Sequence, residues 1–236
     1  MKIALLGYGK MGKVIEQVAL SRGHEIVLRK TSTSSFSGIE SADVAIDFSI
    51  PAAAVGNISE CLRTNVPVVC GTTGWLEDYE RMVDLCKEKK GAFLYGSNFS
   101  LGVNIFFELN AYLAKMMSKL EQYKVSMEEI HHTQKRDAPS GTAITLAEGI
   151  IENSAYTNWM LKNESENQSR NSIAIDAKRI EHVPGTHTVV YDSAVDAIEI
   201  KHTAHNRDGF ALGSVIAAEW IVGKTGIFTM KDVLNL

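Results

Sequence analysis

The sequence of 236 residues contains no apolar run that approaches the roughly 20 residues of a membrane-spanning helix. It also lacks an excess of positive charge, because 24 Lys and Arg stand against 28 Asp and Glu, for a formal net charge of -4. A nucleic-acid backbone is bound by a clustered basic field, which this composition does not provide. We therefore expect neither a membrane nor a nucleic acid as a partner.

Cysteine is scarce, and its spacing is not that of a metal site. The three residues Cys61, Cys70 and Cys86 are odd in number and far apart in the sequence. Reduced thiols in a cytoplasmic protein are the best interpretation. The first 12 residues contain a short apolar run without a small-residue cleavage site, which predicts a strand rather than a signal peptide.

Strand and helix patterns alternate through the first hundred residues. Apolar runs predict strands, the last two of which run into small-residue turns, at 2–6, 24–30, 42–49, 66–74 and 92–100. Helical spacing predicts helices at 13–23, 51–64 and 76–91. This alternation predicts an α/β fold, with a Rossmann-type, doubly wound parallel sheet covered on both faces by helices.

The pattern changes near residues 98–104, where we expect a second, α+β domain with a mixed sheet. Its predicted helices are 104–120 and 141–153, and its predicted strands are 123–132, 173–183, 185–193 and 197–205, with a polar loop at 162–172. A last helix, a glycine-rich turn and a short closing segment follow from residue 209. From the pattern alone, these last elements fit either domain.

A glycine-rich turn joins the first predicted strand to the first predicted helix. Gly7, Gly9 and Gly12 form the pattern G-x-G-x-x-G, which allows a tight turn, close approach to a pyrophosphate and close helix–strand packing. Free N–H groups at the start of the helix favour an anion. The pattern predicts a dinucleotide site, and the alternative is a tight turn without a ligand.

The end of the second predicted strand lacks the carboxylate that usually binds the ribose of NAD. Arg29 and Lys30 stand there instead, followed by Thr31 and Ser32. Two cations and two hydroxyls suit a 2′-phosphate, so we favour NADPH as the cofactor, with NADH possible. The alternative is that both cations are solvated charges at a strand end.

Two later turns, at 70–75 and 95–100, follow the fourth and fifth strands. Ligands of open α/β sheets bind outside the carboxyl ends of the strands, so these turns are candidates for the nicotinamide side of the site. The alternative is ordinary turn chemistry, since Gly, Ser, Thr and Asn are common in turns.

The stretch from His131 to Ala143, HHTQKRDAPSGTA, gathers titratable and small polar residues. A metal site is one interpretation, but adjacent strand residues face opposite sides, so His131 and His132 diverge and we predict no metal. Pro139 can occupy the first helical position, and residues 140–142 then form an anion-binding first turn. With Lys135 nearby, the stretch predicts a proton donor beside a carboxylate site.

These residues resemble the signature of the 4-hydroxy-tetrahydrodipicolinate reductase family, E-hydrophobic-H-H-x-x-K-x-D-A-P-S-G-T-A. The resemblance extends along the chain through GYGKMG, AIDFSIP, VVCGTTGW, SNFSLGVNIFFEL, HTAHNRDGFALGSVIAAEWI and GIFTMKDVL. It implies reduction of (2S,4S)-4-hydroxy-2,3,4,5-tetrahydrodipicolinate to tetrahydrodipicolinate with NAD(P)H, in lysine and diaminopimelate biosynthesis.

Position by position, the resemblance implies roles for named residues. His131 matches a proton donor, and Lys135 matches a second donor or the partner of a substrate carboxylate. The positions that match substrate contacts are His132, Lys135, Ser140, Gly141, Thr142 and Thr73. The positions that match cofactor contacts are Gly7, Lys10, Met11, Gly12, Gly71, Thr73, Ser97 and Phe99.

The resemblance also assigns the C-terminal helix to the first domain and implies a homotetramer built through the sheets of the second. We therefore expect a dinucleotide-binding domain at 1–102 and 208–236, and a substrate-binding and tetramerisation domain at 103–207. Two other functions stay open, namely another two-domain NAD(P)-dependent dehydrogenase and a non-catalytic NADP-binding sensor. No role is assigned to His187, His202 or His205.

Overall fold

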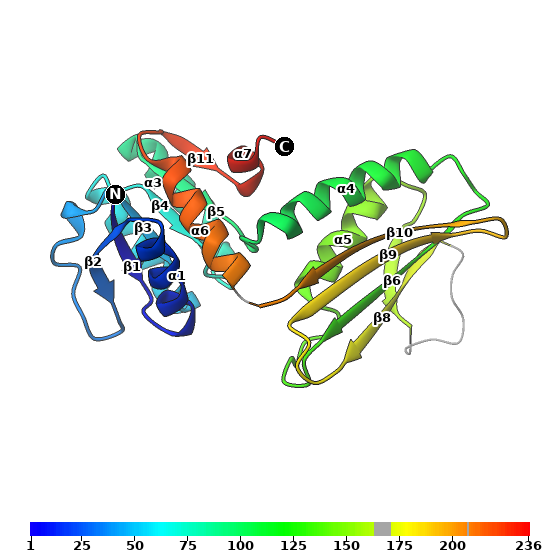
Figure 1. The fold of residues 1–236 in the computed structure, drawn as a ribbon. Helices are drawn as coiled ribbons and strands as arrows, with labels where there is room; N and C mark the ends of the chain where they lie inside the picture. Colours follow the sequence, from blue (N-terminus) through cyan, green and yellow to red (C-terminus); the bar gives the residue numbers. More distant parts are fainter. Residues whose placement is uncertain (163–170, 207) are drawn as a thin grey trace. The chain divides into compact units, whose positions relative to one another are not determined.

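The computed structural model describes residues 1–162, 171–206 and 208–236. The chain divides into two compact units, one formed by Met1–Leu101 with Asp208–Leu236 and the other by Gly102–Arg207 (Figure 1). The first boundary lies one residue before the predicted one. Most of the loop predicted at 162–172, namely 163–170, lies outside the described residues, as does residue 207.

The first unit is a parallel sheet with helices on both faces. Its strands are β1 (Lys2–Leu6), β2 (Glu25–Lys30), β3 (Val44–Asp47), β4 (Val68–Cys70), β5 (Ala92–Tyr95) and β11 (Gly226–Phe228). Its helices are α1 (Lys10–Ser21), α2 (Pro51–Arg63), α3 (Tyr79–Lys89), α6 (Asp208–Ile221) and α7 (Met230–Leu234). All strand pairs are parallel, in the order β11-β5-β4-β3-β1-β2.

Alternate residues of β1 face opposite sides of the sheet, and both sides are apolar, which explains why helices cover both faces. Ile3 and Leu5 are buried in the core that includes residues of α1 and α6. Ala4 and Leu6 are buried on the other face, in the core that includes residues of α2 and α3. A strand that is apolar on both faces is typical of a doubly wound parallel sheet, so the Rossmann-type prediction is confirmed.

The second unit is a mixed sheet with two helices. Its helices are α4 (Leu101–Met117), which begins at the last residue of the first unit, and α5 (Gly141–Glu152). Its strands are β6 (Lys124–His131), β7 (Asn158–Leu161), β8 (Ser172–Arg179), β9 (Gly185–Asp192) and β10 (Ala197–Ala204). They lie in the order β10-β9-β6-β8-β7, with β6, β7 and β8 parallel and the other pairs antiparallel. The mixed sheet is confirmed, although sequence periodicity missed β7, whose four residues are too few to show alternation.

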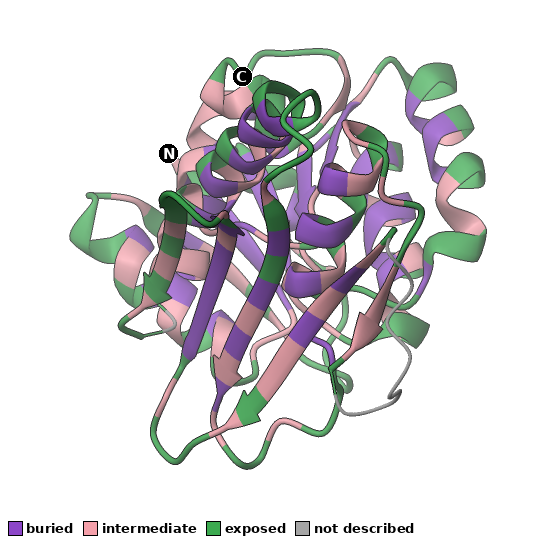
Figure 2. Ribbon diagram, turned by 90° about the vertical axis from the view of Figure 1, so that its right-hand side faces the viewer, coloured by how far each residue is buried: buried purple, intermediate pink, exposed green. Residues whose placement is uncertain are grey.

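The buried face of β6 is apolar in its first half and carries ionisable side chains at its end. Val125 and Met127 are buried in the core that contains residues of α4 and α5. Glu129 and His131 continue the same alternation and are also buried. Figure 2 shows buried residues alternating with less buried ones along strands of this sheet. An apolar face thus ends in two ionisable side chains.

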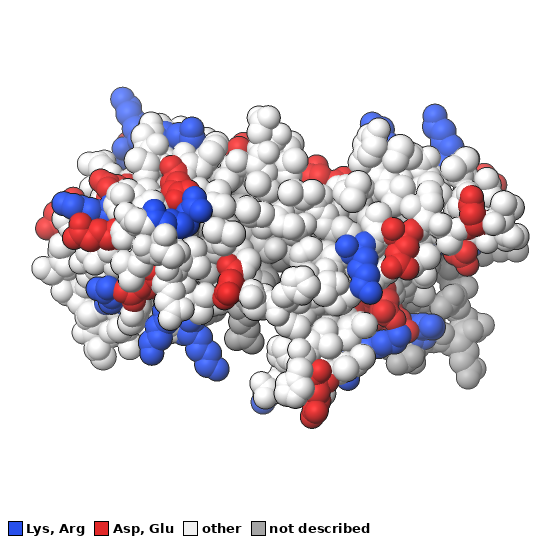
Figure 3. Space-filling model, in the orientation of Figure 1, with Lys and Arg blue, Asp and Glu red and all other residues white. Residues whose placement is uncertain are grey.

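The surface is mixed in charge. On the face shown in Figure 3, Lys and Arg lie among Asp and Glu, and they form no continuous basic field over the described residues. None of the helices in the described ranges is both long and apolar enough to traverse a bilayer.

Candidate active site

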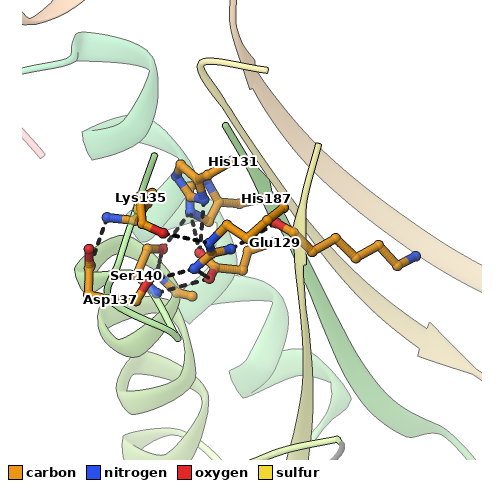
Figure 4. Close-up of polar contacts among 9 residues, drawn as sticks. Glu129, His131, Lys135, Asp137, Ser140 and His187 are labelled. Carbon is orange, nitrogen blue, oxygen red and sulfur yellow. Dashed lines mark hydrogen bonds and ion pairs between the residues drawn. The ribbon is translucent and has the colours of Figure 1, made fainter. Parts of the chain in front are cut away.

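The polar end of the second sheet is built from three strands. In the register of the sheet, Glu129 of β6 lies opposite His187 of β9, and His131 is paired with Arg179 of β8. Glu129, His131 and His187 are 0%, 8% and 5% exposed, so all three are buried. Their side chains lie close together, as Figure 4 shows. Strand pairing therefore assembles one buried cluster from positions far apart in the sequence.

Glu129 is the centre of this cluster. Its Oε1 accepts hydrogen bonds from the backbone N–H of Ser140 and from Nη2 of Arg179, each at 3.1 Å. Its Oε2 lies 3.1 Å from Nδ1 of His131. Burial raises the pKa of Glu129, but the nearby His131 and the hydrogen bonds from Ser140 and Arg179 outweigh it and hold the pKa at about 2. The carboxylate is therefore ionised at neutral pH.

His187 supports the start of α5. Its Nε2 lies 3.0 Å from Oγ of Ser140 and 3.8 Å from Oε2 of Glu129. Burial, followed by the nearby charge of His131, lowers the pKa of His187 to about 4. His187 is thus a neutral imidazole at neutral pH, and the sequence had not pointed to it.

The loop after β6 places Lys135 next to the cluster. Its Nζ lies 2.7 Å from Oδ2 of Asp137. Arg179 donates hydrogen bonds to the backbone carbonyl oxygens of Lys135, at 3.3 Å, and Asp137, at 2.6 Å. The guanidinium therefore links this loop to the Glu129 carboxylate.

The start of α5 differs in detail from the sequence prediction. Ser140 is the N-cap, and its Oγ accepts a hydrogen bond from the N–H of Ala143 at 3.2 Å. The helix begins at Gly141, so Pro139 precedes the cap instead of occupying the first helical position. A serine that accepts from a free helix N–H is a favourable cap, which explains why it displaced the expected boundary.

Three of these groups have the chemistry of metal ligands. Ligand atoms of Glu129, His131 and His187 lie within 4.8 Å of one another. However, Arg179 and the Ser140 N–H already occupy Oε1 of the carboxylate. A guanidinium so close repels a second cation, so we interpret the cluster as a hydrogen-bonded network.

The glycine turn of the first unit has the backbone geometry of a close ligand approach. Gly7 has φ +96°, and a Cβ built on it would lie 2.2 Å from the carbonyl oxygen of Phe48. A Cβ on Gly12 would lie 2.3 Å from the carbonyl oxygen of Gly7, whereas one on Gly9 would meet no atom within 4 Å. The turn therefore requires glycine at two positions for packing and leaves the third open, which fits a dinucleotide.

A cleft of about 310 Å³ adjoins this turn. Gly7 and Gly9 line it together with Lys30, Thr31 and Ser32 from the end of β2. The predicted ribose residues other than Arg29 thus share one cleft with the predicted pyrophosphate turn. Lys10 is the exposed first residue of α1.

Arg29 has a different environment from Lys30. Its guanidinium forms an ion pair with Glu16 of α1 and lies 5.9 Å from the ring centroid of Tyr8. Arg29 is not among the residues that line the cleft. Successive strand residues face opposite sides, which separates Arg29 from Lys30. Of the two cations predicted to bind the cofactor, Lys30 lines the cleft and Arg29 is paired with Glu16.

A smaller cleft, of about 220 Å³, lies at the carboxyl ends of β3 and β4. Met11, Gly71 and Thr73 line it. A Cβ on Gly71 would lie 2.3 Å from the ring of Phe48, so a larger residue there would require the ring to move. Of the other two predicted positions, Ser97 is exposed, and the Phe99 side chain is 1% exposed in the core, which leaves its backbone for any ligand contact.

The loops around this cleft are held by a buried carboxylate. Asp47 is 0% exposed and accepts hydrogen bonds from Oγ1 of Thr72 and Nδ2 of Asn57, each at 2.7 Å. Burial raises the pKa of Asp47 above its ordinary value. The loops that follow β3 and β4 are thus joined by one side chain.

Comparison with known proteins places this geometry in a family. The profile described as "Dihydrodipicolinate reductase, N-terminus" matches residues 1–99, and that described as "Dihydrodipicolinate reductase, C-terminus" matches residues 102–234. The chain belongs to the dihydrodipicolinate reductase family. The resemblance drawn from the sequence motifs is confirmed.

Individual relatives of this reductase family agree. A 4-hydroxy-tetrahydrodipicolinate reductase of Christiangramia forsetii is 56% identical over 100% of this chain and 98% of its own length. One of Methanoregula boonei is 34% identical, over 91% of this chain and 83% of its own. The dipicolinate-bound dihydrodipicolinate reductase from Paenisporosarcina sp. TG-14 has the same fold, with a TM-score of 0.75 at 22% identity over 97% of each chain.

Sequence reasoning missed three residues of the cluster. Glu129 was visible as the acidic member of the signature, but no role had been given to it. A carboxylate two residues before a histidine on a strand shares its face, and this was the available signal. Arg179 and His187 carried no local signal, because only strand pairing brings them to Glu129.

We expect His187 to contribute to the acid sensitivity of the fold. Its pKa is about 4 in the folded protein, against an ordinary value of 6.5. The stability gained from keeping it neutral is present above about pH 6.5 and is lost as the pH falls toward about 4. The decrease in Tm from pH 7 to pH 4.5 should therefore be smaller in His187→Gln than in the wild type, by roughly 5 °C.

Thermal unfolding followed by circular dichroism checks this, with His182→Asn as the control because His182 is exposed. An equal decrease in the wild type and in His187→Gln would show that His187 is not responsible.

Proposed function

We propose that this chain reduces (2S,4S)-4-hydroxy-2,3,4,5-tetrahydrodipicolinate to tetrahydrodipicolinate at the polar end of its second sheet, with NADPH as the reductant. The chain is an oxidoreductase of its family, and the curated relatives bear the name of this reductase. One observation carries the assignment of the site. Glu129 joins the start of α5, His131 and, through Arg179, the loop of Lys135.

The start of α5 suits one carboxylate of a dicarboxylate substrate. Gly141 is exposed, and a Cβ built on it would meet no atom within 4 Å, so an anion can approach the backbone. The positive end of the helix dipole favours a negative charge there. Lys135, now paired with Asp137, can exchange this partner for a substrate carboxylate. Half-buried His132, together with Ser140 and Thr142, completes the proposed substrate contacts.

His131 and Lys135 are the proposed proton donors. The reaction consumes one proton and releases one water, and a bound NADPH supplies the hydride. With Nδ1 of His131 directed at Glu129, its Nε2 is the nitrogen available for proton exchange. The Lys135 ammonium carries protons at the edge of the same cluster, where its side chain is 22% exposed.

We expect His131→Ala and Lys135→Ala each to lower kcat by about 10²–10⁴-fold, the scale of general acid catalysis. Steady-state kinetics on freshly generated substrate provide the measurement, and the Kd for NADPH should stay within about twofold because the cofactor residues lie in the other unit. Lys119→Ala, at an exposed position beyond α4, is the matched control. Turnover close to wild type in both variants would contradict the assignment.

NADPH is the proposed cofactor because of the charge at the end of β2. Lys30, Thr31 and Ser32 line the cleft beside the glycine turn, and no carboxylate is among the described residues that line it. An ammonium and two hydroxyls can bind a 2′-phosphate, which NADH does not have. Gly7, Gly9, Lys10, Met11 and Gly12 would hold the pyrophosphate, and the residues that would lie on the nicotinamide side are Gly71, Thr73, Ser97 and Phe99.

Lys30→Ala should raise the KM for NADPH by about tenfold and leave that for NADH almost unchanged, because a charged hydrogen bond to the phosphate is lost. Arg29→Ala is the matched control, since Arg29 is paired with Glu16. Kinetics with both nucleotides test this. A wild-type kcat/KM that is equal or better with NADH, or a selective effect of Arg29→Ala, would refute the assignment to Lys30.

We also propose a cytoplasmic homotetramer formed through the second sheet. The core against α4 and α5 covers one face of this sheet. Residues on the other face, such as Ser126 and Glu128, are exposed or half-buried. Light scattering should give four times the chain mass of 25.9 kDa, and a mass of one chain would contradict the assembly.

The free, buried cysteines suit the cytoplasm, which cell fractionation checks.

A further inference from the structure

We propose that Glu129 is a positioning residue, whose buried carboxylate fixes the substrate-binding helix start and the proton-donating histidine in one arrangement. The inference rests on the proposed function of the site. Glu129 is 0% exposed, so it acts through other groups and not by contact with solvent or substrate.

A carboxylate at this place in the core needs compensation. Glu129 follows Val125 and Met127 on the buried face of β6. Burial of an unpaired charge is strongly unfavourable, and an apolar residue would continue the alternation without that cost. The presence of a carboxylate at residue 129 is therefore better explained by the groups that it positions than by a gain in the stability of the fold.

The two carboxylate oxygens have different partners. Oε1 accepts from the Ser140 N–H at the cap of α5, and from Arg179, each at 3.1 Å. Oε2 faces Nδ1 of His131 at 3.1 Å and Nε2 of His187 at 3.8 Å. One oxygen thus anchors the anion-binding helix start, and the other orients the imidazole.

Arg179 links the Glu129 carboxylate to the loop that carries Lys135. Besides its bond to Glu129, the guanidinium donates to the backbone carbonyls of Lys135 and Asp137, at 3.3 Å and 2.6 Å. It also neutralises the carboxylate, which allows full burial. Glu129 therefore positions the cap of α5 and His131 directly, and it positions the loop of Lys135 through Arg179.

The charge of Glu129 has a specific consequence for His131. The groups that face His131 are Glu129 on its own strand, His187 on β9 and Arg179, its register partner on β8. Among these, Glu129 is the anion, and its Oε2, 3.1 Å from Nδ1, favours the tautomer that carries the proton on Nδ1. With its proton on Nδ1, His131 exchanges protons with the substrate through Nε2.

Glu129→Gln tests the charge with little change of shape. Its amide oxygen can still accept from the Ser140 N–H, but the anion facing His131 is lost. We expect kcat to fall by about 10–100-fold, with the substrate KM changed less than about threefold. Glu129→Ala also releases the helix cap, so its KM should rise by about tenfold or more.

Glu148→Gln is the matched control, an exposed carboxylate on α5. The Kd for NADPH and the circular dichroism spectrum establish that each variant is folded. An unchanged kcat in Glu129→Gln would overturn the positioning role, even though the wild type turns over substrate. A wild type without this activity would refute the proposed function instead.

A measurement on the wild type does not depend on variants that fold. Nitrogen-15 NMR of histidine-labelled protein, with His131→Gln used for assignment, should show a proton on Nδ1 of His131 at neutral pH. A neutral His131 protonated on Nε2 would contradict the proposed role of Glu129. Loss of wild-type activity on chelation, with recovery on adding Zn²⁺, would also overturn it, because the cluster would then be a metal site.

Discussion

The second unit depends on one buried ionic contact, between the Glu129 carboxylate and the donors that surround it. Three elements meet at this side chain, because the Ser140 N–H comes from the cap of α5, Arg179 from β8 and Nδ1 of His131 from β6 itself. Each donor partly compensates for the desolvation of the charge. The same donors are thereby held in place, so the contacts that compensate for the buried charge also fix the start of α5 and His131 relative to each other.

The two units form their binding surfaces by different physical means. In the first, the backbone dominates, since Gly7, Gly12 and Gly71 are places where a Cβ would collide with neighbouring atoms. In the second, side chains dominate, through a polar cluster at the end of an apolar sheet face. A dinucleotide offers a long phosphate chain that many backbone N–H groups can contact, whereas a small dicarboxylate needs charges at defined points.

Much of this arrangement could be predicted from local sequence patterns. The α/β alternation, the glycine turn and the stretch from His131 to Thr142 each depend on residues close in the chain. The errors were also local. Ser140 and not Pro139 defines the start of α5, because a side chain that bonds a free N–H outweighs the preference of proline for a first turn. Strand β7 was missed because four residues carry too little periodicity.

The sequence by itself determined the family, the class of fold and the residues proposed to supply protons and bind an anion, because these follow from short-range spacing and side-chain chemistry. Only the tertiary structure decided which of them act together. Strand register places Arg179 and His187 next to Glu129. The packing of α1 against β2 pairs Arg29 with Glu16, whereas Lys30 lines the cleft beside the glycine turn. Such choices depend on contacts between residues distant in the chain, where no local periodicity carries the information.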